Sequence, residues 1–516
     1  MAAKTPQNLR AVVDVGSSSM TMKIAKLSRN KPPKILETLR GNLALGIDAY
    51  NAKFIRESNI DRCCEILQNF SMKLDEYGLA QSDCRVIATS ALREAQNRQY
   101  VIMRIAQDVG FKVEVLDNSI ERYYHNMAIS ETLPEFPKLI EEGALILDIG
   151  SGSIQVSAFK DKDCLFSQNL LLGVLRVTEM LGSLREQTKD YVSLMNEYVD
   201  SEINDFHILE GRGMDFSHLI ALSPGTAYLK QLADLSSETN TVDSQQLEEI
   251  YQALQRKSPL QMTLDRNVPT DIAEILLPTG VIIHKYADYN DLKEIYMPQA
   301  DVLDGILIEM ATECYRYKPN YDHMQDTISN VRNLARRFRC DEPHINFVED
   351  VSLKVFDAIK FRFHLTPRHR LLLQLGSLLH DIGKFIHMNH HSHRSFNIIN
   401  FIEIIGITEK EREIVAWISR MHSSTKLPGQ EMLGRMSWDI RFDVLRLAAI
   451  LRLADALDAA HRQKFVQLDA SVSKNDLILR YATNEDITLE RTSLKCKGQM
   501  FKSVYGMTPV LKPKRK

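Results

Sequence analysis

The sequence predicts an α/β protein built as two related halves and followed by a mainly helical domain. One observation is a glycine- and serine-rich turn that occurs twice, each time after a hydrophobic strand ending in aspartate: AVVDVGSSS from Ala11 and LILDIGSGS from Leu145. A second is the change beyond about Asp301 to long helical periodicity with few strand signals. The third is that ten of the fifteen histidines lie between His344 and His461. The repeated turn predicts two halves that face each other across a cleft.

Strand and helix patterns follow one another in each half. In the first half we expect helices over 55–77, 93–109 and 120–131, and strands over 85–88 and 112–116 after the initial hairpin. Pro134-Glu135-Phe136-Pro137 predicts a hinge, and the strand-turn-strand order restarts at Ala144. A strand over 218–222 then runs into Ser223-Pro224-Gly225-Thr226 and a helix, whose first amides could meet a phosphate. The expected domains are 1–130, 131–310, 311–470 and a small segment, 471–516, that is β-rich or poorly ordered.

Length, charge and cysteine usage narrow the class of protein. The 516 residues exceed what one hydrophobic core usually supports. The net charge of -3 does not favour a general nucleic-acid binder, and no apolar run approaches the roughly 20 residues of a membrane span. Seven scattered cysteines without a CxxC pair favour a reducing compartment. We therefore expect a cytoplasmic protein with neither a nucleic-acid nor a membrane partner.

The two turns have the chemistry of a phosphate site. Backbone amides and hydroxyls in a tight turn can bind phosphate oxygens, and the aspartate before each turn, Asp14 or Asp148, can hold a divalent cation. Arg93 is the best candidate for a cationic side chain, because a guanidinium group matches phosphate oxygens. The alternative for Arg93 is a salt bridge with a neighbour such as Glu94.

A series of motifs resembles the exopolyphosphatase/guanosine pentaphosphate phosphatase (Ppx/GppA) family. In order they are AVVDVGSSS, ATSALREAQN, a lone Glu121 that opens a helix, LILDIGSGS, GVLRVTE, SPGT and DVLDG. The resemblance covers about residues 9–310 and continues into the helical domain. It implies a duplicated actin-like (ribonuclease-H-like) ATPase fold, whose cleft binds polyphosphate or guanosine tetra- or pentaphosphate with Mg²⁺. In that family, water attacks the terminal phosphorus.

The resemblance also implies roles for individual residues. Asp14 and Asp148 become the carboxylates on the magnesium side, and Glu121 becomes the general base that deprotonates water. The residues implied in phosphate binding are Gly16, Ser17, Ser18, Arg93, Gly150, Ser151, Gly152, Ser153, Gly225 and Thr226.

Four positions depart from the family pattern. Ser18 stands where asparagine is usual, and Tyr123 and Leu303 stand where arginine is usual. Gln155 replaces a carboxylate and can serve neither as a base nor as a charged metal ligand. These departures leave open a second hypothesis, in which the cleft senses a phosphate chain or alarmone without hydrolysing it.

The helical domain contains a second motif. The dipeptide His380-Asp381, with His344 upstream and Asp455 downstream, resembles the HD-domain metal phosphohydrolases, which would give a fold of two α/β halves and an all-α HD-type domain. His391, His393 and His422 stand where two-metal members place further ligands. The resemblance implies a second divalent metal (Mn²⁺, Fe or Mg²⁺) here. The alternative is a metal-free remnant that binds the phosphate chain or forms the dimer.

The leading prediction is an exopolyphosphatase that releases terminal phosphate from inorganic polyphosphate by magnesium-assisted attack of water. Guanosine pentaphosphate is the alternative substrate. The third hypothesis is that the helical domain is itself a metal phosphohydrolase acting on nucleotides. The family resemblance implies a homodimer.

Overall fold

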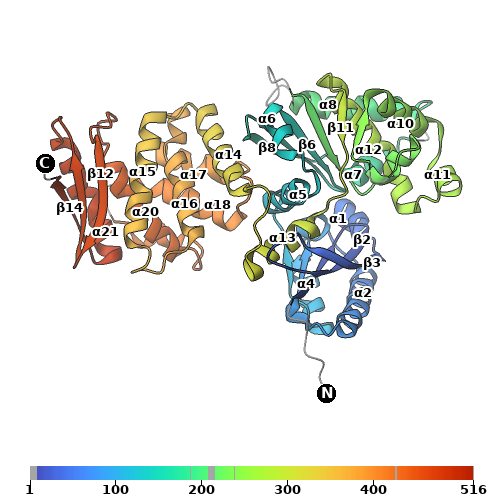
Figure 1. Cartoon of the computed structure of the whole chain (residues 1–516), viewed down its shortest axis with the longest axis horizontal. Helices are drawn as coiled ribbons and strands as arrows, with labels where there is room; N and C mark the ends of the chain where they lie inside the picture. The colour runs from blue at the N-terminus through green and yellow to red at the C-terminus, as the bar shows by residue number, and fades with distance from the viewer. Residues whose placement is uncertain (1–7, 186, 207–215, 237–238, 425–426, 515–516) are drawn as a thin grey trace. The chain divides into compact units, whose positions relative to one another are not determined.

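A computed structural model describes residues 8–185, 187–206, 216–236, 239–424 and 427–514. The chain forms two compact units, Met1–Asp326 and Thr327–Lys516 (Figure 1). The division falls inside helix α14 (His323–Arg337), later than the expected boundary at 310. Within the described ranges, no helix combines the length and the apolar character needed to cross a membrane.

Two mixed sheets with the same central arrangement form the framework of the first unit. Their strand orders are β3-β2-β1-β4-β5 and β10-β11-β9-β6-β7-β8. In each sheet the strand that carries the aspartate pairs antiparallel with the next strand and parallel with a later one: β1 with β2 and β4, and β6 with β7 and β9. The strands are β1 (Leu9–Val15), β2 (Ser19–Lys26), β3 (Lys34–Asn42), β4 (Cys84–Ala88), β5 (Val113–Val115), β6 (Ala144–Ile149), β7 (Ile154–Lys160), β8 (Asp163–Leu170), β9 (His218–Leu222), β10 (Thr241–Asp243) and β11 (Glu294–Tyr296). The predicted duplication of an α/β half is confirmed.

Helices cover the faces of these sheets. They are α1 (Leu45–Ala52), α2 (Glu57–Glu76), α3 (Ser90–Glu94), α4 (Arg98–Asp108), α5 (Asn118–Thr132), α6 (Phe136–Glu142), α7 (Val174–Gly182), α8 (Tyr191–Phe206), α9 (Thr226–Leu232), α10 (Ser244–Arg256), α11 (Pro259–Arg266), α12 (Thr270–Tyr289) and α13 (Val302–Tyr315). The single helix expected over 93–109 is wrong, because α3 and α4 are separate. Between them Asn97 donates to Ile55 O (2.9 Å) and accepts from Ile55 N (3.0 Å), which ties the interruption to the connection between α1 and α2.

Helix α13 returns the chain to the first half. Buried residues of α13 share a hydrophobic core with β1 and α5, in which Val12 and Ile306 are fully buried. The two helices cross closely, because a Cβ at Gly305 would lie 2.1 Å from Tyr124 O. Only glycine fits this crossing. The first half is therefore not continuous in sequence. The domain boundary expected at residue 310 falls inside α13, a helix that belongs to the first half.

The second unit is a helical bundle with a small sheet. Its helices after α14 are α15 (Glu342–Ile359), α16 (Pro367–Leu379), α17 (His391–Phe401), α18 (Glu409–Met421), α19 (Gln430–Gly434), α20 (Arg441–Ala456) and α21 (Thr488–Tyr505). The sheet has the order β12-β13-β14, from β12 (Gln467–Ser473), β13 (Asp476–Ala482) and β14 (Thr508–Pro513). The C-terminal segment thus contains a helix of 18 residues besides its strands, since α21 connects β13 to the parallel strand β14. Phe501 of α21 is fully buried in the core of the bundle.

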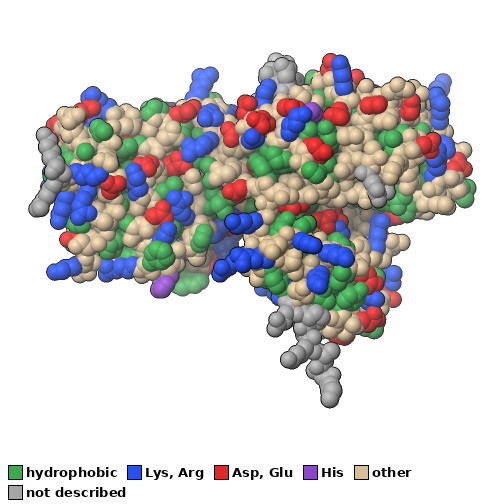
Figure 2. Space-filling view, viewed as in Figure 1, with side chains coloured by type: hydrophobic (Ala, Val, Ile, Leu, Met, Phe, Trp, Pro, Cys, Tyr) green, Lys and Arg blue, Asp and Glu red, His purple; other side chains and the backbone are tan. Residues whose placement is uncertain are grey.

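Charges of both signs are interspersed on the surface. On the face that Figure 2 shows, Lys and Arg side chains lie among Asp and Glu side chains over both units. This mixture agrees with the small net charge of -3. A polyanion must therefore be bound by a local site.

Candidate active site

A cavity of about 470 Å³ lies between the two halves of the first unit. Both glycine- and serine-rich turns line it, together with the end of β9 and the segment before α13. The predicted site residues that line the cavity are Asp14, Gly16, Ser17, Ser18, Glu121, Asp148, Gly150, Ser151 and Thr226. The predicted residues outside this lining are Arg93, Gly152, Ser153 and Gly225. Most of the expected phosphate site is thus brought together by the fold.

The two turns are closed in the same way. Gly16 N donates to Ser19 O (3.1 Å), and Gly150 N donates to Ser153 O (3.0 Å). These two amides therefore close the turns, and the amides after each glycine are the candidates for binding phosphate. The second turn is also held from outside by α7, whose first amides, from Val174 and Leu175, donate to the carbonyls of the turn at 3.0 Å.

The junction after β9 contributes less than expected. Gly225 N donates to Ser223 Oγ (3.2 Å), and the Thr226 hydroxyl donates to Ser223 O (2.9 Å). Both groups thus bond within the turn itself. Thr226 still lines the cavity through α9, a helix of seven residues.

Carboxylates gather on one side of the cavity. Asp14 Oδ1 is buried and, among the described residues, has no hydrogen-bond partner. Burial, and then the nearby charges of Glu121 and Asp301, raise the pKa of Asp14 to about 8. A divalent cation would relieve this repulsion and occupy the free oxygen, and carboxylate oxygens are the ligands that Mg²⁺ prefers. The free oxygen of Asp14, with the charge of Asp301 nearby, therefore fits magnesium, whereas Asp148, the other predicted ligand, is paired with His125.

Arg93 forms a salt bridge with Glu121. Its Nη1 donates to Glu121 Oε2 (2.8 Å) and to Leu116 O (2.7 Å). The alternative, a salt bridge with a neighbouring carboxylate, is thus present, but its partner is Glu121 and not Glu94, which pairs with Lys53 and Arg176. Arg93 thus lies outside the cavity lining and holds Glu121, the expected base, in place.

Two residues in the cavity were missed by the sequence reasoning. His125 Nδ1 lies 2.5 Å from Asp148 Oδ2. Burial alone would lower the pKa of His125, but the carboxylate of Asp148 raises this pKa to about 9. Lys23 Nζ lies 2.7 Å from both Asp301 Oδ2 and Asp304 Oδ1. The spacing of Glu121 and His125 by four residues on α5, which places them on one helix face, could have indicated the first.

The glutamine that replaces a family carboxylate is buried away from the cavity lining. Gln155 is 3% exposed, and its Oε1 accepts from Arg122 Nε (3.1 Å). Arg122 is 1% exposed and also donates to Ser167 Oγ. Gln155 is thus the neutral partner of a buried guanidinium group, which the sequence alone did not indicate.

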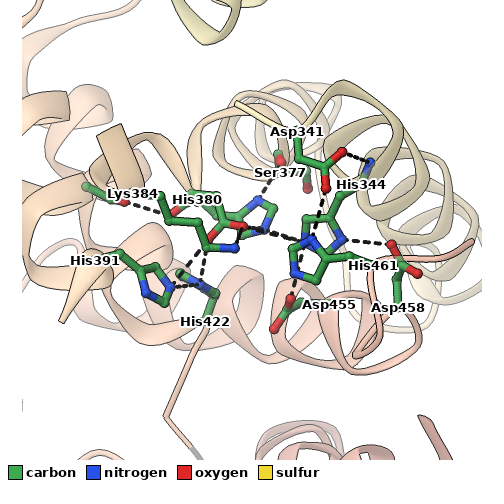
Figure 3. Close-up of polar contacts among 12 residues, drawn as sticks. Asp341, His344, Ser377, His380, Lys384, His391, His422, Asp455, Asp458 and His461 are labelled. Carbon is green, nitrogen blue, oxygen red and sulfur yellow. Dashed lines mark hydrogen bonds and ion pairs between the residues drawn. The ribbon is translucent and has the colours of Figure 1, made fainter. Parts of the chain in front are cut away.

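In the second unit, the four predicted metal ligands converge. His344 Nε2 lies 3.2 Å from His380 Nε2, 3.7 Å from Asp381 Oδ2 and 3.6 Å from Asp455 Oδ1 (Figure 3). Burial lowers the pKa of His380 to about 3, so this imidazole is neutral and can act as a ligand. His391 and His422 lie beside Asp381. His393 does not, and its ring instead lies 6.2 Å from that of His390.

The comparisons with known proteins agree with this geometry. Residues 24–313 match the model of the Ppx/GppA phosphatase family, and residues 328–497 match Ppx/GppA phosphatase, domain III. The chain belongs to the Ppx/GppA phosphatase family. The predicted resemblance and the enzyme class, a hydrolase of phosphoanhydride bonds, are confirmed. The helical unit matches domain III of this same family, and its HD-type character stays a prediction.

Relatives extend over nearly the whole chain. A guanosine-5'-triphosphate,3'-diphosphate pyrophosphatase of Photobacterium profundum is 22% identical over 479 residues, which are 91% of each chain. The protein of the same name from Pseudoalteromonas translucida is 20% identical over 495 residues, 94% of this chain and 93% of its own.

Solved structures of the family cover the first unit. An exopolyphosphatase from Cytophaga hutchinsonii, 18% identical, covers 60% of this chain and 100% of its own with a TM-score of 0.51. A Ppx/GppA family member from Aquifex aeolicus, also 18% identical, covers 61% of this chain and 99% of its own with a TM-score of 0.50. At this identity the likeness supports the fold of the two halves.

Proposed function

We propose that the cavity of the first unit releases terminal phosphate from inorganic polyphosphate with the help of Mg²⁺. The observation that supports this proposal best is the pairing of two phosphate-type turns with the carboxylates of Asp14 and Glu121 in one cavity of about 470 Å³. Phosphoryl transfer needs positioning and charge neutralisation more than covalent chemistry. These groups supply both.

Each residue would act in a simple way. The amides and hydroxyls after Gly16 and Gly150 would bind the terminal phosphate, and Glu121, held by Arg93, would accept a proton from water. The oxygen of that water bonds to the terminal phosphorus as the bond from phosphorus to the bridging oxygen breaks. The bridging oxygen stays with the shortened chain. Magnesium bound to Asp14 would neutralise charge on the phosphate. Asp148, paired with His125, would complete the second side of the site.

The lining of the cavity favours a bare phosphate chain over a nucleotide. Among the described lining residues there is no Phe, Tyr or Trp on which a guanine could stack. Lys23 and Arg40 line it besides His125, and Arg40 pairs with Asp271 (2.6 Å) of α12. A polyanion entering between the halves would compete with Asp271 for this guanidinium group.

Guanosine pentaphosphate remains the second candidate substrate, because two relatives that match over 90% of this chain are named for that activity. The test measures initial rates of orthophosphate release from long-chain polyphosphate and from guanosine pentaphosphate, each with and without Mg²⁺. We expect a higher kcat/KM with polyphosphate. A higher value with guanosine pentaphosphate would reverse the assignment, and binding without release from either would identify a sensor.

A further inference from the structure

We propose that the helical unit holds a dinuclear centre for divalent transition-metal ions, bridged by the carboxylate of Asp381. His344, His380 and Asp455 would complete the first ion site, and His391 and His422 the second. The proposal concerns a site separate from the phosphate cavity and does not depend on the function proposed for it. Figure 3 shows that His344, His380, His391, His422 and Asp455 converge on a common region.

The first ion site has the spacing of a coordination polyhedron. Ligand atoms at about 2.1 Å from a metal lie about 3.0 Å apart in an octahedron and about 3.4 Å apart in a tetrahedron. The distances from His344 Nε2 are 3.2 Å to His380 Nε2 and 3.6 Å to Asp455 Oδ1. The distance between His380 Nε2 and Asp381 Oδ2 is also 3.6 Å. One ion would fit between these atoms with small side-chain movements.

The second ion site uses the other oxygen of the same aspartate. His391 Nε2 lies 3.1 Å from His422 Nε2 and 3.3 Å from Asp381 Oδ1, and His422 Nε2 lies 3.5 Å from that oxygen. Oδ2 of Asp381 thus faces the first set of ligands, and Oδ1 faces the second. A carboxylate that bridges in this way places two ions about 3.5–4 Å apart.

All four histidines are held with Nε2 directed into the centre. His380 Nδ1 donates to Ser377 O (2.8 Å), and His422 Nδ1 donates to Ser419 O (2.5 Å). His391 Nδ1 donates to Met388 O (3.1 Å), and His344 Nδ1 donates to the carboxylate of Asp458 (2.8 Å). A second hydrogen bond of this kind fixes the tautomer and orientation of metal-ligating histidines. The ring of His461 stacks on His344 at 3.7 Å and restrains it further.

These hydrogen bonds leave pairs of Nε2 atoms facing one another. With each Nδ1 bonded to an oxygen atom, the Nε2 atoms face one another across both histidine pairs, at 3.2 and 3.1 Å. Asp381 is 3% exposed, and its buried Oδ1 has no hydrogen-bond partner in the described part of the chain. Buried acceptors without donors are costly. A cation in each position would satisfy all of these atoms together.

The charges around the centre indicate what the loaded site would bind. Lys384 Nζ pairs with Asp381 (2.5 Å) and Lys497 with Asp455, while Asp458 holds His344. Three carboxylates and two ammonium groups leave one negative charge, which two divalent ions would convert to three positive charges. An oxyanion, such as a phosphate group, is therefore the expected ligand. Imidazole ligands favour Mn, Fe, Co or Zn over Mg²⁺.

The test counts ions in the full-length protein. The chain is stripped with EDTA, reloaded with Co²⁺ in excess Mg²⁺, and desalted before elemental analysis and visible absorption. We expect about two Co²⁺ per chain in the wild type and about one in His391→Ala, whose side chain is 20% exposed. Asp381→Asn, of nearly the same shape, should lose both ions. His393→Ala is the matched control and should keep two, as should Asp14→Asn in the phosphate cavity.

Other outcomes would overturn the inference. One Co²⁺ in the wild type would exclude a bridged pair, and none would exclude the centre. Equal loss in His391→Ala and His393→Ala would show that the assigned ligands are wrong. Inorganic phosphate should shift the Co²⁺ absorption bands of the wild type, and an unchanged spectrum would refute the oxyanion ligand.

Discussion

Replacing Arg93 with methionine removes the ion pair that holds Glu121 while keeping a side chain of similar length. The two side chains are 17% and 14% exposed and meet at 2.8 Å. A hydrogen bond between charged groups contributes about 1.5–3 kcal/mol. If this energy positions the base, kcat for polyphosphate should fall by about ten- to a hundredfold. KM should change by less than about threefold, because Arg93 does not touch the phosphate.

The assay measures orthophosphate release over a range of polyphosphate concentrations at saturating Mg²⁺. Arg62→Met is the matched control, because Arg62 forms an exposed pair with Glu65 (2.6 Å) in the same half and should have no effect on either constant. A KM that rises about tenfold or more with kcat unchanged would refute the positioning role. It would show that Arg93 binds phosphate, as the sequence had suggested.

Three further predictions concern the same cavity. Glu121→Gln should abolish most hydrolysis and leave polyphosphate binding, measured by equilibrium titration, nearly intact; unchanged turnover would exclude Glu121 as the base. Gln155→Glu should place a carboxylate against buried Arg122 and raise the melting temperature without increasing kcat, whereas a several-fold gain in kcat would show that the cavity lacks this carboxylate. Asp14 has a folded-state pKa of about 8 against 3.8 when unfolded, so in EDTA its contribution to stability is present below about pH 4 and is lost as pH rises toward 8. The melting temperature of the wild type should fall over this range more steeply than that of Asp14→Asn, and parallel curves would contradict the buried, proton-binding Asp14.

Local chemistry explains which parts of the cavity could be predicted from sequence. The turns after Asp14 and Asp148 are specified by adjacent glycines and serines, so their conformation depends on neighbours in the chain. The partner of Arg93 is Glu121, 28 residues away. Nothing in the neighbouring sequence indicates that Arg93 pairs with this carboxylate and not with Glu94. Lys23 was missed because its carboxylate partners are supplied by α13, nearly 280 positions later.

The helical unit shows the same limit. His380-Asp381 is a local signal, and His344 and Asp455 were found because the HD-type resemblance supplied the spacing. The pairing of His391 with His422 depends on how α17 packs against α18, so sequence could not separate His391 from His393. The helix in the C-terminal segment was missed because short alternating runs on either side of it indicated only strands.

The return of α13 to the first half has a consequence for synthesis. The core that α5 shares with α13 stays incomplete from Thr132 until Val302 and the helix after it have been made, a gap of about 170 residues. At a translation rate of about 5–20 residues per second, a ribosome needs roughly 10–30 s to synthesise this stretch. During that time the apolar faces of β1 and α5 have no partner from α13. A nascent chain stalled near residue 300 would therefore expose Val12 and Tyr124, and such surfaces are where chaperones bind and aggregation begins.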